Sequence, residues 1–355
     1  MKKLIALLQL ALAIGLIVFL FYRMENRGQL MGAVRSILSH WGYLVAALLM
    51  AFACLMLCTV RWNIIMRSYG ITLPFREVFQ LYFVGHFFNA FMFGAVGGDL
   101  IKAVYVAKAV PERRTESVAT IFIDRLVGLL ALVFLASVVI AIRFRFFLRY
   151  PETRKTMAFM IAVLVATVVG LFVVFRQNLL ERFSFFRRME ANTALGQILG
   201  KVYAAFHHCL RHRGLMTRAI GLSLMNHTTL VMAAWLLGLG LGIRTTHPAP
   251  DAVPDAPPSI AVLAHELANY MTVFPIVNGI AAIPATPGGL GTRDVATKFL
   301  LGVPEFGVPA TRAVPLSLLL YGVMFFWSLF GGGVYMLYVA KAGRVTVQEL
   351  DAAAG

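Results

Sequence analysis

Charged residues are scarce in this sequence of 355 residues: Asp, Glu, Lys and Arg make up 14% of it, whereas hydrophobic residues make up 60%. A soluble domain carries about 25% charged residues, because its surface needs polar cover. Together with a mean hydropathy of +0.80, this deficit excludes a soluble globular protein, a disordered chain and a disulfide scaffold. The composition predicts a polytopic membrane protein.

Acidic residues and cysteines are also few. The 16 Asp and Glu stand against 32 Lys and Arg. On a soluble chain this excess would suggest nucleic acid, but basic loops orient membrane proteins and meet anionic headgroups. We therefore expect no nucleic-acid partner. No CxxC pair or Cys/His cluster offers a metal site, so Cys54, Cys58 and Cys209 are expected to be inert thiols.

Catalytic templates are absent as well. The sequence has no GxSxG, no HExxH, no Walker lysine and no DxD-like pair in a sizeable extramembrane loop. We therefore predict no catalytic residue, no metal and no cofactor, and expect that the protein is not an enzyme.

Long apolar runs are what the sequence has instead. About 20 apolar residues cross the roughly 30 Å hydrocarbon core as a helix. Six full spans are expected, at residues 4–22, 42–60, 117–142, 157–175, 219–243 and 313–340. The first begins like a signal peptide, but no small-x-small cleavage site follows, so we expect an uncleaved span.

Two further regions, 75–110 and 259–301, combine an apolar arm, a Gly-rich break that ends in Asp, and a second arm too short to span. Irregular backbone at membrane depth is tolerated only where protein or a watery cavity surrounds it. The pattern predicts two re-entrant helical hairpins. The fold class is therefore an all-α polytopic bundle of about six full spans and two Gly-broken hairpins, which would form an inverted pair.

Basic residues give the orientation. With a cytoplasmic N-terminus, nineteen Lys and Arg fall on the cytoplasmic side and ten outside, as the positive-inside rule favours. Both termini are then cytoplasmic. The segment 143–155 fits this orientation poorly, because its five basic residues fall outside.

The chain reads as a single transmembrane domain, 1–355, with two extramembrane segments. Residues 177–213 mix Leu and Phe with Arg and Lys, which is typical of an amphipathic helix on an anionic leaflet. Residues 245–258 (TTHPAPDAVPDAPP) have the composition of an extended extracytoplasmic linker. Neither segment is large enough for a catalytic domain.

The Gly-rich breaks are candidate anion sites. A break at Gly97 and Gly98 leaves backbone N–H groups free, and a helix N-terminus attracts phosphate. Asp99 is a suitable cap for the following helix. Lys102 stands near the first break and Arg293 near the second. The alternative is that the glycines only permit a tight turn.

Four ionisable groups lie inside apolar stretches. Asp124 and Arg125 interrupt the run 117–142, where an unpaired charge costs roughly 2.5–3.5 kcal/mol or more. Arg125 would grip a headgroup phosphate with its two-pronged guanidinium; the alternative is a structural ion pair. Glu266 is a single acid in another apolar stretch and suits a proton-coupled role. His227 is expected to make an interhelical hydrogen bond.

Three motifs occur in order along most of the chain: NAFMFGAVGGDLIK at 89–102, DRLVGL at 124–129 and PATPGGLGTRD at 284–294. In this the sequence resembles the flippase-like membrane family related to the transmembrane half of lysylphosphatidylglycerol synthases. That family's usual pattern near the last motif is Pro-x-x-Pro-Gly-Gly-x-Gly followed by an acid, most often Glu. Here the acid is Asp294.

The resemblance implies a multi-pass protein of the bacterial cytoplasmic (inner) membrane that moves amphipathic lipids or feeds lipid modification. Family members have been linked to aminoacylated phospholipids, hopanoids and polyprenyl-linked sugars. The aminoacyl-transferase domain of the bifunctional synthases has no counterpart in this sequence, so we expect no lysyl transfer.

We therefore predict a lipid transporter or flippase whose partners are membrane lipids with an anionic headgroup. Homo-oligomerisation and a partner from lipid biosynthesis are left open. Two alternatives remain: an intramembrane enzyme that uses Asp99 or Asp124 as a base, and a transporter of small solutes. The predicted substrate-binding residues are Asn89, Gly94, Gly97, Gly98, Asp99, Lys102, Asp124, Arg125, Glu266, Pro284, Pro287, Gly288, Gly289, Gly291, Arg293 and Asp294.

Overall fold

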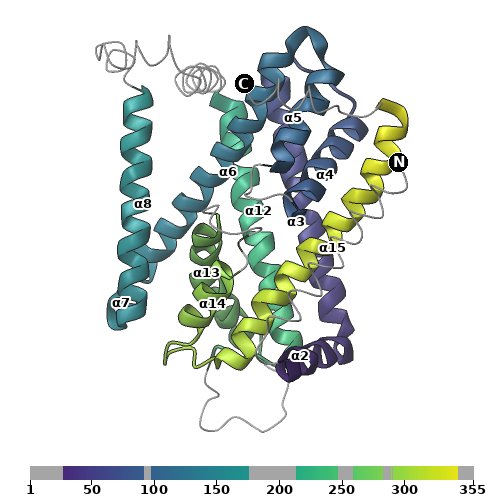
Figure 1. Ribbon diagram of the computed structural model, residues 1–355. Coiled ribbons are helices and arrows are strands. Elements are labelled where there is room, and N and C mark those ends of the chain that lie inside the picture. Colours follow the sequence, from purple (N-terminus) through teal and green to yellow (C-terminus); the bar gives the residue numbers. More distant parts are fainter. Residues whose placement is uncertain are drawn as a thin grey trace.

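The computed structural model describes residues 27–91, 97–175, 213–246, 259–282, 289 and 291–342. Within these ranges the regular structure is helical throughout, which confirms the predicted all-α class (Figure 1). The helices are α2 (Arg27–Ser39), α3 (Trp41–Ser68), α4 (Phe75–Phe91), α5 (Gly97–Ala109), α6 (Arg114–Ile142), α7 (Phe144–Arg149), α8 (Pro151–Phe175), α12 (Arg213–Gly240), α13 (Ile260–Ala281), α14 (Thr292–Leu301) and α15 (Ala310–Ala342), with a 3-10 turn at Pro111–Arg113.

Six of the described helices are long and apolar enough to cross a membrane. Five of them, in α3, α6, α8, α12 and α15, correspond to predicted spans. The predicted span 4–22 lies outside the described residues. The sixth is α13, which the sequence analysis treated only as one arm of a hairpin; its 22 residues are enough to span by length and composition.

Several helices extend past the apolar runs that predicted them. Helix α3 continues to Ser68. Arg61 therefore lies inside the helix, whereas the predicted span ended at residue 60 and left Arg61 in a loop. Helix α8 begins at Pro151 and α12 at Arg213, a residue that the sequence analysis assigned to the amphipathic segment. Arg and Lys are good helix formers, so a hydropathy window ends before the helix does.

The two predicted hairpins are pairs of packed helices at opposite ends of the bundle. Helix α4 packs on α5, and α13 packs on α14. Figure 1 shows the first pair in the upper half of the molecule and the second in the lower half. Helices α6 and α15 each contact both pairs. The long helices therefore join two short-helix units.

Each half has its own apolar core. The core around α4 and α5 includes Trp62, Leu81 and Tyr105, and the core around α13 and α14 includes Phe274, Leu300 and Leu320. Between α4 and α15 the backbones approach closely, because a Cβ at Gly331 would overlap with the carbonyl oxygen of Phe83.

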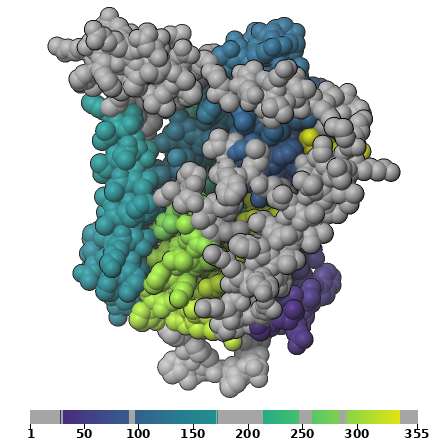
Figure 2. Space-filling view, viewed as in Figure 1, coloured from purple at the N-terminus to yellow at the C-terminus, as the bar shows by residue number. Residues whose placement is uncertain are grey.

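Helix α8 stands along one edge of the molecule (Figure 2). Its exposed residues are mostly apolar, and the large ones include Ile161, Val165, Val169 and Phe172. Exposing this apolar face to water would be unfavourable, whereas lipid tails are as apolar as the face itself. The end of α8 and the start of α12 lie at the same end of the bundle as α5 (Figure 1). The segments 177–212 and 247–258 lie outside the described residues.

Candidate functional site

A buried ion pair joins α3 to α6. The Arg61 guanidinium donates from Nε to Asp124 Oδ1 at 2.7 Å and from Nη2 to Asp124 Oδ2 at 3.0 Å. Its Nη1 donates to the hydroxyl of Ser223 in α12 at 2.8 Å. Both charged side chains are about 5% exposed. Asp124 thus has a buried partner that the sequence analysis did not name, and a bidentate pair with a third hydrogen bond satisfies most of its polar atoms.

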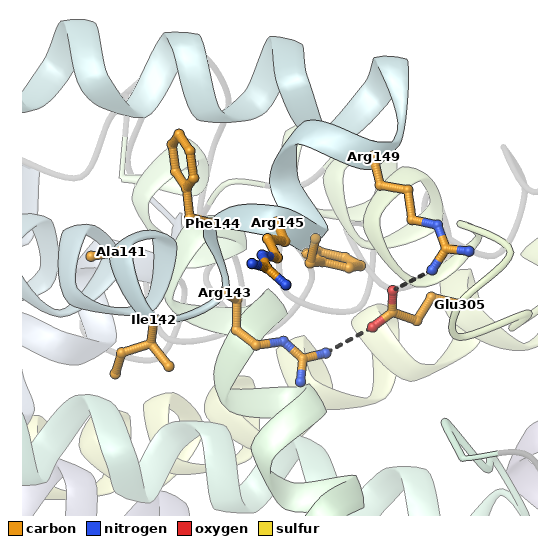
Figure 3. Close-up of a pocket in the computed structure, with 8 residues that line it drawn as sticks. Ala141, Ile142, Arg143, Phe144, Arg145, Arg149 and Glu305 are labelled. Carbon is orange, nitrogen blue, oxygen red and sulfur yellow. Dashed lines mark hydrogen bonds and ion pairs between the residues drawn. The ribbon is translucent and has the colours of Figure 1, made fainter.

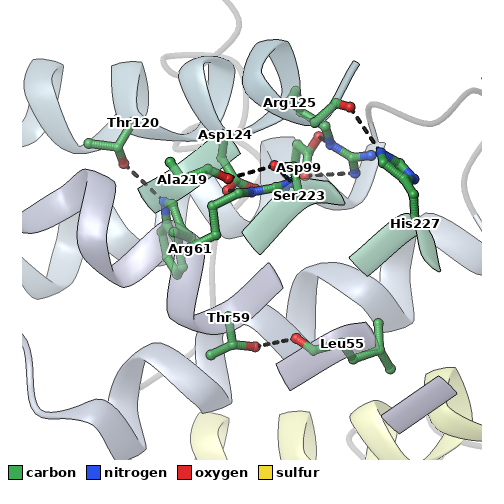
Figure 4. A network of polar contacts seen from close by, with 12 residues as sticks. Leu55, Thr59, Arg61, Asp99, Thr120, Asp124, Arg125, Ala219, Ser223 and His227 are labelled. Atoms are coloured by element: carbon green, nitrogen blue, oxygen red, sulfur yellow. Dashed lines mark hydrogen bonds and ion pairs between the residues drawn. The ribbon is translucent and has the colours of Figure 1, made fainter. Parts of the chain in front are cut away.

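Polar groups continue along the same helices (Figure 4). The imidazole of His227 in α12 lies 3.0 Å from the carbonyl oxygen of Gly128 in α6, as the interhelical interpretation predicts. The Cys54 thiol donates to the side-chain oxygen of Asn226 at 2.6 Å. Cys54 and Cys58 are both buried and unoxidised; Cys209 lies outside the described residues. These contacts form a polar layer between the two apolar cores.

Arg125 pairs with Asp99 across the α5–α6 interface. Its Nε donates to Oδ2 at 2.5 Å and its Nη2 to Oδ1 at 3.0 Å. In contrast to Arg61, the Arg125 side chain is 50% exposed. Neighbouring residues on one helix thus face different surroundings: Asp124 is buried in the bundle, and Arg125 reaches an accessible surface. A half-exposed arginine fork held by one carboxylate is able to exchange that carboxylate for another oxyanion.

Lys102 lies beside this pair but is almost completely buried, at 3% exposure. Its ammonium sits 3.5 Å above the centre of the Trp62 ring and 4.5 Å from that of Tyr82. The Trp62 indole in turn donates to the Thr120 hydroxyl at 3.0 Å. Two aromatic faces stabilise a cation that water reaches poorly, so the charge of Lys102 is held within α5 next to Asp99.

The N-terminus of α5 is held by Asn89 of α4. The Gly98 N–H donates to the side-chain oxygen of Asn89 at 2.9 Å. The sequence analysis suggested Asp99 as the cap, but the Asp99 carboxylate is occupied by Arg125 and Asn89 accepts in its place. Gly98 is required sterically, because a Cβ there would overlap with the Gly85 carbonyl and the Asn89 backbone.

The second break is arranged differently. Asp294 turns back on its own helix and accepts from the Gly291 N–H at 3.0 Å, a capping contact at the start of α14. Its other oxygen accepts from the Ser317 hydroxyl of α15 at 2.6 Å. Gly289 and Gly291 have φ of 73° and 84°, a backbone region that favours glycine. The guanidinium carbon of Arg293 lies 5.8 Å from the centre of the Tyr321 ring.

Glu266 is placed apart from both breaks. It is 1% exposed and accepts from Arg244 at 3.1 Å and from Thr246 at 3.3 Å. Both partners belong to the segment that follows α12. Glu266 therefore ties α13 to the end of α12.

The structure brings together Asn89, Gly98, Asp99, Lys102 and Arg125 at one end of the bundle, with Asp124 directly beneath them. Gly289, Gly291, Arg293 and Asp294 belong to the other end. The predicted site residues Gly94, Pro284, Pro287 and Gly288 lie outside the described residues.

Three residues of the first group were missed by the sequence analysis: Arg61, Trp62 and Ser223. Arg61 could have been considered, since a basic residue directly after an apolar run can also be buried. The sequence did not show, however, which residue would be its partner. Among the described residues, no group of three or more His, Cys, Asp or Glu is placed to hold a metal ion.

Comparison with known proteins identifies the family. The family model described as the lysylphosphatidylglycerol synthase TM region matches residues 6–249. This covers more than two thirds of the chain, including the α4–α5 pair and the Arg61–Asp124 and Asp99–Arg125 contacts. The protein belongs to this family of multi-pass membrane proteins involved in lipid handling. Neither the search of curated proteins nor the search of solved structures gave a match.

Proposed function

We propose that this protein is a flippase that moves an amphipathic lipid with an anionic headgroup across a bacterial cytoplasmic membrane. The observation that carries the proposal is the Asp99–Arg125 pair. Arg125 lies within the apolar helix α6, yet its side chain is half exposed and its fork is occupied by a carboxylate. A cation at this depth is costly unless it serves a ligand or a partner.

The headgroup phosphate would compete with Asp99 for the Arg125 fork. A phosphate diester presents two oxygens with the spacing and charge of a carboxylate, so it can replace Asp99 without leaving the guanidinium unpaired. Lys102 adds a second positive charge close by, and Asn89 holds the start of α5, where the helix dipole also favours an anion. The lipid's acyl chains would remain in the bilayer.

The two helix pairs would act as re-entrant hairpins that enter from opposite sides. Helices α4, α5 and α14 have 17, 13 and 10 residues, fewer than the about 20 residues of a typical full crossing. Broken helices in inverted arrangements commonly bring helix ends to one substrate pathway near the midplane. Gly94, Gly97, Pro284, Pro287 and Gly288 would shape the breaks, and Arg293 would offer the headgroup its next cation.

In this proposal the chain transports and does not catalyse. The acids near Arg125 are engaged: Asp99 with Arg125, and Asp124 with Arg61. Asp124 is not free to act as a base while it holds Arg61, and Asp99 is not free while it holds Arg125. Energy would come from a gradient or from downhill redistribution of lipid, and Glu266 is the acid available for proton coupling. Both termini would face the cytoplasm, on the side of α5.

The test is lipid translocation in proteoliposomes with fluorescent phosphatidylglycerol and phosphatidylcholine. Arg125→Lys keeps the charge but loses the two-pronged geometry, so it should slow phosphatidylglycerol movement at least about tenfold. The matched control is Arg67→Lys, an exposed arginine at the same end of the bundle, which should leave the rate unchanged. Equal rates for all three proteins would refute a headgroup role for Arg125.

The same preparation separates the two alternatives. An intramembrane enzyme would convert the lipid to a new product, which mass spectrometry of the liposome lipids would detect. A transporter of small solutes would carry soluble anions into the lumen without moving labelled lipid.

A further inference from the structure

The arginine-rich corner between α6 and α8 is unexplained by the proposed transport site. Arg143 follows the last residue of α6, and Arg145 and Arg149 lie in the short helix α7. The sequence analysis expected an outside loop here and found its basic residues at odds with the orientation. The structure shows instead a helical corner that packs on the α14–α15 connection through Glu305.

These arginines line a pocket of about 510 Å³ together with Ile142, Phe144 and Glu305 (Figure 3). That volume lies within the roughly 300–1,000 Å³ typical of ligand sites. Arg143 donates to Glu305 at 2.9 Å and Arg149 approaches it at 4.0 Å. Three arginines around one carboxylate leave the pocket two positive charges in excess.

The arginines are unequally engaged by the protein. No hydrogen bond or ion pair of Arg145 with another described residue is recorded, and its side chain is exposed. The Nε of Arg143 is buried without a hydrogen-bond partner among the described residues. A buried guanidinium donor without an acceptor is unfavourable, so the pocket has donor capacity left for an anion.

Apolar side chains surround the same pocket. Ile142 and Phe144 line it and are 76% and 48% exposed, and Leu148, in the same short helix α7, is 45% exposed. Because the corner joins two helices that are long enough to span the membrane, it lies at a membrane surface. Arginines interleaved with exposed apolar residues at that level match a lipid: phosphate at the guanidinium groups, acyl chains against Ile142, Phe144 and Leu148.

We propose that the α6–α7 corner is a second binding site for an anionic phospholipid, in the leaflet opposite to the Arg125 site. Arg143 directly follows α6, eighteen residues after Arg125, a rise of about 27 Å along the helix, close to the thickness of the hydrocarbon core. Figure 1 shows α7 and α5 at opposite ends of the bundle. The excess of arginine on the side where the positive-inside rule disfavours it then has a function.

Photo-crosslinking of the full-length protein tests this site. The protein is placed in phosphatidylcholine nanodiscs that contain a minority of phosphatidylglycerol carrying a diazirine near the headgroup end of its acyl chains. Peptide mapping should find label on residues 142–148. Arg145→Gln should lower this labelling about fivefold, as expected for one arginine at an anionic interface, and Arg145→Lys should restore most of it.

Arg35→Gln is the matched control, since Arg35 is an exposed arginine of α2 at the same end of the bundle; it should label like the native protein. Equal labelling of the Arg145→Gln and Arg35→Gln proteins would overturn the proposal. So would equal labelling of this segment by a phosphatidylcholine analogue, or its loss in excess inorganic phosphate, which would indicate a site for soluble anions. The Arg125→Lys protein should be labelled on residues 142–148 like the native protein. The labelling therefore tests this second site even if the proposed transport function is wrong.

Discussion

The α4–α5 and α13–α14 pairs share a sequence pattern, but their acids have different partners. In the first pair Asp99 reaches across to Arg125 of α6. In the second, Asp294 caps its own helix and accepts from Ser317 of α15. An ion pair at an accessible surface can exchange partners, whereas a capping carboxylate is part of the helix end. Under the proposed transport function, the first pair would recognise the headgroup and the second would mainly shape the pathway.

The cations also differ between the two halves. Beneath Asp99 lies the buried Arg61–Asp124 pair, which fixes α3, α6 and α12 relative to one another. In the lower half the arginines of the Arg143–Glu305 and Arg244–Glu266 ion pairs are 27% and 47% exposed, against about 5% for Arg61. In the upper half, the buried Arg61–Asp124 pair therefore supports the accessible Asp99–Arg125 pair above it.

The largest effect is expected from Arg61→Met, which leaves the Asp124 carboxylate buried without its partner. Breaking a buried pair costs about 3–5 kcal/mol. Thermal unfolding of the purified protein in detergent should show a large loss of stability. The double change Arg61→Met with Asp124→Leu should recover most of it, because no uncompensated charge remains. A double variant as unstable as the single one would show that the pair is needed for more than neutralisation.

An intermediate effect is expected from Gly98→Ala in α5, compared with Gly279→Ala in α13. At Gly98 the added methyl group meets backbone of α4, so the helices must separate, at about 1–3 kcal/mol. At Gly279 it meets only the flexible end of Met160, at 3.3 Å, and the gain in helix propensity of up to about 1 kcal/mol offsets the contact. Melting temperatures of the two variants, measured side by side, test the difference; equal losses would contradict it.

The smallest change in stability is expected from Asp99→Asn and Asp294→Asn. Asn still accepts hydrogen bonds and caps helices about as well as Asp, so Asp294→Asn should change stability by less than about 0.5 kcal/mol and leave lipid translocation intact. Asp99→Asn should cost about 1 kcal/mol, since the Arg125 side chain is half exposed, and should alter translocation markedly. Translocation rates that fall equally in both variants would contradict the different roles of the two acids.

Much of the fold was predictable because the bilayer constrains the sequence strongly. The apolar runs located α3, α6, α8, α12 and α15, and the Gly-rich breaks located both short-helix pairs. The ends of the helices were less predictable, as Arg61 and Lys155 show, because helices continue through polar residues that a hydropathy window excludes. The α7 corner was taken for a loop, since six residues are too few for a periodic signal.

The site was predictable in part. Asp124 and Arg125 stood out as charges in an apolar run, and Asp99 and Lys102 followed a Gly-rich break. Asp124 and Arg125 point in different directions because successive helical residues are turned by roughly 100°, but which of the two faces inward depends on the neighbouring helices.

The sequence by itself determined that this is an all-α membrane protein, because its apolar runs have the length of about 20 residues that crosses the bilayer as a helix, in which the backbone polar groups are satisfied within the segment. It also determined where charged residues interrupt the apolar runs and where the Gly-rich breaks lie. Only the tertiary structure decided which charges meet. The Arg61–Asp124 partners are 63 residues apart and those of Asp99–Arg125 are 26 apart, so helix packing, and no local rule, made one aspartate a buried anchor and the other an exchangeable ligand of arginine.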